Sequence, residues 1–196
     1  TISRNGDLVS NLWLDVVMPT VTTTVVNKDT DKHTGTYINW VNNTGHALIK
    51  ECELEIGGQR IDRHYGHWLD IQNELYDHDE KDWIGLNKHS ANKPYLLSGP
   101  HGDGVSPPQF KLYVPLKFWF CDNPGLALPL IALQYHEVKI RLTTRGMKGL
   151  INTDADIETP TAVPTVQLWA DYIYLDTDER RRFAQVSHEY LIEQVQ

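Results

Sequence analysis

The chain has 196 residues, of which 40% are hydrophobic and 22% are charged, as is ordinary for a globular protein of one domain or at most two small ones. The formal net charge of −8 argues against a protein that grips duplex DNA, because phosphate contacts require clustered lysine and arginine. The basic run Arg180–Arg182 follows acidic residues, which indicates a solvated turn or a helix start rather than a phosphate site.

The first third of the chain predicts strands separated by turns. Residues 7–19 alternate with period two and end at a proline, and the inward set is Leu8, Leu12, Leu14 and Val16. Residues 20–26 are all β-branched and favour extended chain, residues 27–35 form a polar loop, and residues 36–41 form a strand followed by the turn "NNTGH".

Residues 47–62 predict a β-hairpin. The alternation places one set on a common face, namely Leu48, Lys50, Cys52, Leu54 and Ile56. Gly57-Gly58 supplies the two positive-φ positions that a tight hairpin turn requires.

The period then changes, and the spacing predicts one substantial helix over Gly66–Asp77. Its apolar residues lie three and four positions apart, at Trp68, Ile71, Leu75 and Tyr76. The following segment Asn87–Gln109 is rich in glycine, proline and serine, and its length predicts a loop that forms part of an intersubunit or outer surface.

Three further segments, 110–120, 128–144 and 165–177, are typical of strands, and Pro124-Gly125 predicts a turn that folds the second run back beside the first. Alternation places Phe118 and Phe120 on one face with Leu116, while Trp119 points the other way. The apolar density of these runs predicts a core that includes Phe118, Phe120, Leu128, Leu130, Ile131 and Leu133. The final residues predict a short helical turn followed by an exit segment.

Strands broken by Gly- and Pro-rich turns, with one clear helix, predict an all-β sandwich or barrel. The apolar stretch Leu116–Leu133 fails as a transmembrane helix, because a lysine, an aspartate, two prolines and a glycine interrupt it. The chain shows no initiator methionine and no leader-like start, so we expect a fragment of a longer protein.

Nine histidines raise the question of a metal site. His64 and His67 lie three apart with Asp62 and Asp70 nearby, but a zinc site needs three or four converging ligands. We therefore expect no bound metal, and we expect both histidines at the surface or bonded to backbone groups. The adjacent pair His136-Glu137 points to opposite faces of a strand and cannot cooperate directly.

The remaining candidate sites are weak. Cys52 and Cys121 predict buried, reduced thiols in strands rather than a disulfide framework. The acidic run "LYDHDEKDW" predicts a solvated face, "GPHGDG" lacks the lysine and helix start of a phosphate loop, and no nucleophile elbow is present, so we expect no catalytic residue and no cofactor. Asn42 begins a formal N-glycosylation sequon, which matters only if the chain enters a secretory compartment.

Two long stretches carry a specific resemblance, "ELEIGGQRIDRHYGHWLDIQNEL" at Glu53–Leu75 and "VPLKFWFCDNPGLALPLIALQYHEVKI" at Val114–Ile140. Both are similar to signature stretches of the major capsid proteins of nucleocytoplasmic large DNA viruses, the group of iridovirus, algal-virus and giant-virus capsid proteins. Both ends of the chain resemble that family too, so the similarity covers nearly the whole chain in the family's order.

The resemblance implies an antiparallel jelly-roll β-sandwich with one short helix and long loops. Residues 1–177 would be the first jelly roll of a double jelly-roll capsid protein, without the family's N-terminal arm, and residues 178–196 a linker toward a second jelly roll. It implies a structural protein of the virion, assembled in the host cytoplasm into trimeric pseudo-hexagonal capsomers of an icosahedral shell. Its partners would be further copies and minor capsid proteins, with an inner viral membrane nearby and no direct nucleic acid contact.

Two other functions fit the same architecture. A carbohydrate-binding jelly-roll module would present Trp40, Trp68 or Trp83 in an open groove for stacking on sugars. A cupin-like metalloenzyme would need histidine and glutamate from neighbouring strands pointing into the barrel.

Overall fold

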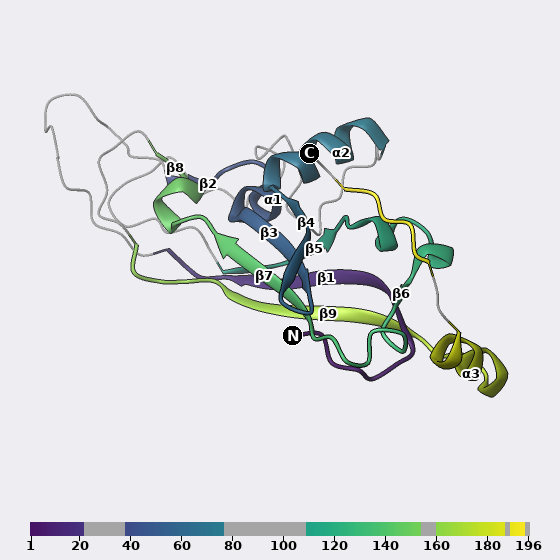
Figure 1. The fold of residues 1–196 in the computed structure, drawn as a ribbon. Helices are drawn as coiled ribbons and strands as arrows, with labels where there is room; N and C mark the ends of the chain where they lie inside the picture. The colour runs from purple at the N-terminus through teal and green to yellow at the C-terminus, as the bar shows by residue number, and fades with distance from the viewer. Residues whose placement is uncertain (22–37, 77–108, 154–159, 187–188, 195–196) are drawn as a thin grey trace, which may run out of the picture.

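The computed structural model describes residues 1–21, 38–76, 109–153, 160–186 and 189–194. In these ranges the protein is mostly β, with antiparallel sheets and three helices, and it is elongated (Figure 1). The extended chain expected at 22–26, the polar loop at 27–35, Trp83 and nearly all of the loop Asn87–Gln109 lie outside the described residues.

The larger sheet is built around β1 (Leu8–Met18). Strand β9 (Thr165–Ile173) pairs along almost the whole of β1, while β5 (Phe110–Leu116) and the two-residue β6 (Leu128–Pro129) share its other edge, all antiparallel. This sheet joins the beginning, the middle and the end of the described chain, so the strands expected at 7–19, 110–116 and 165–173 are confirmed.

A bulge corrects the expected inward set of β1. Between Val9 and Asn11, β1 advances by two residues while its partner β9 advances by one. The alternation of side chains before this bulge is therefore offset from the alternation after it. Val9 is therefore buried in place of Leu8, whereas Leu12, Leu14 and Val16 point inward as the alternation predicts.

The second sheet has the order β4-β3-β7, formed by β3 (Ile49–Ile56), β4 (Gln59–His64) and β7 (Val138–Thr144). The predicted β3–β4 hairpin is confirmed, with φ of 59° at Gly57 and 84° at Gly58, the region that favours glycine. A register shift between Ile49 and Glu51 buries Ile49 and exposes Lys50, which alternation alone had placed on the face of Cys52.

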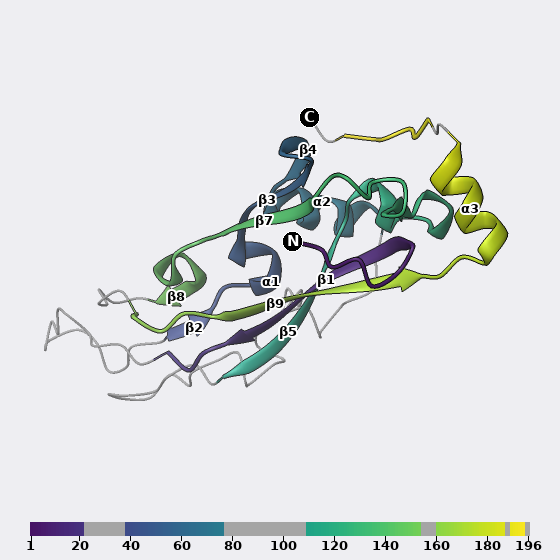
Figure 2. The ribbon, with the colours of Figure 1, turned by 60° about the horizontal axis from the view of Figure 1, so that its bottom comes forward.

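The two sheets lie against each other, and a short pair of β2 (Ile38–Trp40) with β8 (Ile151–Thr153) lies toward one end of the long axis (Figure 2). One hydrophobic cluster joins the inward side chains of β1, β3 and β5 to Trp40, Leu69 and Met147. The core therefore lies between the sheets, as a sandwich requires.

Within the described ranges three α-helices accompany the sheets, and one of them was not expected. Helix α2 (Gly66–Tyr76) confirms the predicted helix, although Ile71, Leu75 and Tyr76 on its apolar side are exposed by half or more. The turn expected at "NNTGH" continues instead into the short helix α1 (Thr44–Leu48). The expected C-terminal helical turn is α3 (Thr177–Gln185), whose first turn is capped by the Asp176 carboxylate accepting from the Glu179 N–H at 2.8 Å.

The expectation of continuous strands over 117–120 and 130–137 is wrong. Residues Trp119–Cys121 and Pro124–Leu126 form 3₁₀ turns, and residues 130–136 form further turns before β7 begins. Because the chain curls here, Phe118, Trp119 and Phe120 are all buried, and the rings of Phe118 and Phe120 stack with centroids 5.7 Å apart. Leu128 and Leu130 are in the core as predicted, while Ile131 and Leu133 are only partly buried.

Candidate functional site

The two histidines considered as metal ligands lie in different environments. His64 is fully buried, and its ring stacks on Phe118 with centroids 4.3 Å apart. Neither ring nitrogen has a hydrogen-bond partner in the described part of the chain, and burial lowers the pKa of His64 to about 4. The expectation that His64 lies at the surface or bonds to backbone is wrong, because the hairpin turns it inward opposite Cys52.

His67 lies at the exposed start of α2, where its Nδ1 is 3.4 Å from an Arg145 nitrogen. Asp62 is buried, and Asp70 accepts from the Asn43 side-chain amide at 2.6 Å and lies 3.6 Å from His46 Nδ1. The four residues do not converge, and within the described ranges no three His, Cys, Asp or Glu side chains form a group that could hold a metal ion.

The pair His136-Glu137 does not lie in a strand as expected, because His136 is in a bend and Glu137 directly precedes β7. The Glu137 carboxylate accepts from Thr1 Oγ1 at 3.0 Å and pairs with Lys139 Nζ at 2.7 Å, so it serves a surface network. Asn42 is exposed in the turn before α1, while the hydroxyl of Thr44 is buried and donates to the Val41 carbonyl at 2.7 Å. Glycosylation at Asn42 stays a prediction.

Both cysteines are free thiols. Cys52 lies in β3 as expected, whereas Cys121 ends the 3₁₀ turn that follows Phe118 and not a strand. Burial raises the pKa of each thiol to about 12, and this disfavours the thiolate that oxidation and metal binding require. Persistence of the reduced state stays a prediction.

An acid–base pair that sequence reasoning missed fixes the start of α3. Asp7 accepts from the Leu175 N–H at 2.8 Å and from the Arg180 guanidinium at 2.9 Å. The Leu175 N–H, with help from Arg180, lowers the pKa of the Asp7 carboxyl. Since 173 positions separate Asp7 from Arg180, no local sequence signal could have paired them.

The face of the larger sheet that points away from the core carries an aromatic row. Trp13 of β1 lies between Trp169 of β9 and Pro115 of β5. Two residues further along β1, Asp15 lies opposite Tyr113 of β5. Trp169 is 59% exposed and Tyr113 is 40% exposed. We call this surface, formed by Trp13, Tyr113, Pro115 and Trp169, the outer sheet face.

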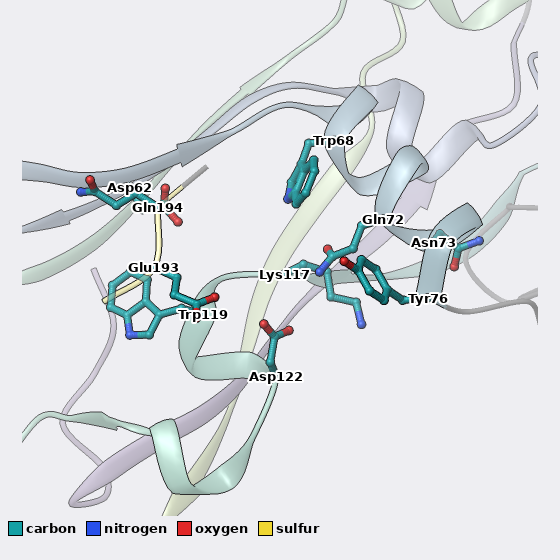
Figure 3. Close-up of a pocket in the computed structure, with 10 residues that line it drawn as sticks. All are labelled: Asp62, Trp68, Gln72, Asn73, Tyr76, Lys117, Trp119, Asp122, Glu193 and Gln194. Carbon is teal, nitrogen blue, oxygen red and sulfur yellow. The ribbon is translucent and has the colours of Figure 1, made fainter. Parts of the chain in front are cut away.

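A second surface feature is a cavity of about 630 Å³ beside α2 (Figure 3). Trp68, Gln72, Asn73 and Tyr76 of α2 line one side, Lys117, Trp119 and Asp122 line the base, and Asp62, Glu193 and Gln194 close the remaining side. Trp119 is held there because its Nε1 donates to the Tyr190 hydroxyl at 2.9 Å. The sequence singled out Trp68 but could not show which residues would surround it.

The C-terminal segment returns along the body after α3. The Tyr190 hydroxyl donates to the Leu126 carbonyl, and the Gln194 side-chain amide donates to the Ile61 carbonyl. Together with Phe183 and Ile192 the segment borders an apolar groove of about 550 Å³ along Ile131 and Leu133. No helix in the described ranges is long and apolar enough to cross a membrane.

The geometry defines a class of protein, namely an antiparallel two-sheet β protein with an aromatic outer sheet face. A family model described as the major capsid protein N-terminus matches residues 1–176. The chain therefore belongs to the family of major capsid protein N-terminal regions of large DNA viruses, and the resemblance seen in the sequence is confirmed.

Individual relatives agree with that assignment. The major capsid protein of Pyramimonas orientalis virus is 47% identical over 195 residues, and capsid protein 1 of Acanthamoeba polyphaga mimivirus is 42% identical over 218 residues; each match covers 100% of this chain. A chain in a quasi-atomic model of the PBCV-1 virus capsid superposes with a TM-score of 0.68 at 38% identity, and the match covers 100% of this chain and 42% of that chain. The chain spans 44% and 34% of the two relatives' own lengths, that is, less than half of each.

Proposed function

We propose that the protein is a building element of a viral shell, acting as the first jelly roll of a double jelly-roll major capsid protein. The observation that carries the proposal is the superposition of the whole chain on a capsid chain with a TM-score of 0.68 at 38% identity. The antiparallel two-sheet architecture supports a jelly-roll sandwich, in which residues 1–177 form the jelly roll and residues 178–196 lead toward a second one.

The outer sheet face supports association with further copies. Trp169 is exposed on β9, and the second backbone edge of β9 has no partner strand in the described part of the chain. Exposed aromatic rows at a sheet edge are favourable contact points, because tryptophan and tyrosine bury much area for little conformational cost. We infer trimers of the longer protein, which present six jelly rolls as a pseudo-hexagonal tile of an icosahedral lattice.

The charge of the chain supports the remaining assignments. A formal net charge of −8 fits a shell protein that does not contact nucleic acid directly. The same proposal places the protein in the virion after assembly in the host cytoplasm, in contact with minor capsid proteins and close to an inner membrane.

The two alternative functions meet different difficulties. A cupin-like centre is not supported, because His64 faces Phe118 and lacks a carboxylate on either ring nitrogen. For a sugar-binding module, Trp40 is only 1% exposed and cannot stack on a ligand, whereas Trp68 does line an open cavity. That cavity is compatible with a shell protein and does not compete with the proposed function.

The test is the oligomeric mass of the full-length protein by light scattering, together with electron microscopy of its assemblies. We expect a trimer and pseudo-hexagonal particles, and we expect Trp169→Arg to weaken the assembly by placing a charge in the contact. Tyr135→Arg is the matched control, because Tyr135 is 89% exposed but lies in the turns before β7 and outside the sheet. A monomer that forms no ordered particle under any condition of assembly would refute the proposal.

A further inference from the structure

The cavity beside α2 is lined by aromatic, amide and charged side chains. Its walls come from four separate parts of the chain: β4, α2, the 3₁₀ turn after β5, and the C-terminal segment. Its volume of about 630 Å³ lies within the range of about 300–1,000 Å³ that is usual for small-molecule sites.

Two buried polar atoms on α2 lack partners among the described residues. These atoms are Nε1 of Trp68, which can only donate, and Oε1 of Gln72, which can only accept. Figure 3 shows the Trp68 indole nitrogen and the Gln72 amide directed toward the space between α2 and the turn that carries Trp119 and Asp122. A buried polar atom without a partner is costly, so a ligand that offers both an acceptor and a donor gains free energy here.

The charged groups of the cavity are mainly acceptors. Asp122 and Glu193 come from different elements and face the same space, and Lys117 is the cation that lies with them. Burial raises the pKa of the Asp122 carboxyl, Lys117 opposes this change, and the nearby Glu193 carboxylate adds to it. The lining therefore holds carboxylate acceptors, side-chain amides and the Tyr76 hydroxyl that both donate and accept, one ammonium donor and the Trp68 indole donor.

The aromatic side chains add apolar area. Tyr76 is 77% exposed at the rim, and Trp68 lies across the cavity from the turn that carries Trp119. Ligand sites typically combine such an apolar wall with a few polar groups that fix orientation.

We propose that this cavity binds a saccharide of pyranose size. Each sugar hydroxyl both donates and accepts, so one ligand supplies an acceptor to Trp68 Nε1 and donors to Gln72 Oε1 and the carboxylates. The less polar face of a pyranose ring fits against the aromatic wall. An organic cation fits less well, since an ammonium group satisfies the carboxylates but leaves the indole N–H without an acceptor.

The experiment titrates the purified protein with a panel of methyl pyranosides, followed by saturation-transfer NMR and tryptophan fluorescence. We expect saturable, millimolar binding of at least one sugar. Trp68→Phe keeps an aromatic ring but removes the donor, and Gln72→Met removes the acceptor. Each should weaken binding about two- to tenfold, the effect of one lost hydrogen bond.

Trp169→Phe is the matched control, because Trp169 is exposed on the outer sheet face and no residue of β9 lines this cavity. It should leave the sugar affinity unchanged. Circular dichroism and the melting temperature establish that each variant is folded, and Gln72→Met decides the matter if Trp68→Phe does not fold.

Three results would overturn the proposal. The first is that no pyranoside binds. The second is that a pyranoside binds equally well to wild type, Trp68→Phe and Gln72→Met. The third is that n-butylammonium, used as the cation probe, occupies the cavity in the NMR experiment and no sugar displaces it. A glycan array extends a positive result, and retention of longer glycans in a Trp68-dependent manner would support the same site.

Discussion

The cluster around Phe118 and the outer sheet face are both rich in aromatic side chains, but they differ in how they are covered. Phe118 is fully buried, with His64 stacked on one side at 4.3 Å and Phe120 at 5.7 Å between ring centroids. Trp169 and its neighbour Trp13 have cross-strand partners, yet Trp169 stays 59% exposed.

The difference shows that buried and exposed aromatic side chains have different roles in this domain. Side chains that the chain itself covers contribute to the free energy of folding. Side chains that stay exposed in a row on the outer sheet face contribute instead to the free energy of association, when another surface covers them. Substitutions in the first group should therefore change stability, and substitutions in the second should change association.

Phe118→Ala is expected to have the largest effect on stability. Removal of a fully buried phenylalanine should lower the free energy of unfolding by about 3–5 kcal/mol, a large part of a typical domain stability of about 5–15 kcal/mol. Chemical denaturation measures the change, with the exposed Tyr135→Ala as control. Equal denaturation midpoints for wild type and Phe118→Ala would contradict the assignment of Phe118 to the core.

Acidification tests the same cluster through His64. Its pKa is about 4 in the folded protein against 6.5 for an ordinary histidine, so the unfolded chain binds the proton more readily. The contribution of neutral His64 to stability is fully present above pH 6.5 and is lost as the pH falls from 6.5 toward 4. The loss is about 3 kcal/mol, since each pH unit between the two pKa values corresponds to about 1.4 kcal/mol.

The measurement compares urea unfolding of wild type and His64→Phe across that pH interval. His64→Phe should lose less stability on acidification than wild type, because phenylalanine cannot take up a proton. The same slope in both proteins would show that other groups carry the acid sensitivity.

Gly66→Ala tests whether α2 is seated as closely on the core as the structure indicates. A Cβ at Gly66 would lie 2.1 Å from the His46 carbonyl oxygen and 2.5 Å from that of Ile49, and backbone atoms cannot move aside cheaply. We expect a loss of about 1–3 kcal/mol despite the better helix propensity of alanine. Gly149→Ala is the matched control, because a Cβ there meets nothing within 4 Å; a neutral Gly66→Ala would mean that α2 is loosely attached.

Trp169→Arg should have the smallest effect on the isolated chain. The residue is exposed, so the free energy of unfolding should change by no more than about 0.5 kcal/mol while assembly of the longer protein weakens. Thermal unfolding of the chain and the oligomeric mass of the full-length protein give the two numbers. A marked loss of stability without a change in association would reverse the comparison between the two regions.

Strands with a regular period were predictable, and irregular apolar stretches were not. Residues 110–116 and 128–137 are both apolar, yet the first is a strand along β1 and the second is mostly turns. High apolar content predicts burial, and Leu128 and Leu130 are buried accordingly. It does not say whether a partner strand is available, which is what makes an extended segment part of a sheet.

The candidate sites show the same division. Local spacing predicted the position of α2, and the sequence offered Trp68, with Trp40 and Trp83, as a sugar contact of the alternative function. It could not show that Asp122 and Glu193 would face Trp68 across a cavity, or that His64 would turn inward. Those outcomes depend on contacts between residues that are far apart in the chain.

By itself, the amino-acid sequence determined the β-rich class, the hairpin at Gly57-Gly58, the helix at Gly66–Tyr76 and membership of the capsid family, since periodicity, turn chemistry and family motifs are local properties. Only the tertiary structure decided the phase of β1 and β3, because a bulge depends on the partner strand and reverses the side chains beyond it. It also decided which aromatic residues are buried, because the segments that cover Phe118 are distant in the sequence, whereas Trp169 stays exposed in the described part of the chain.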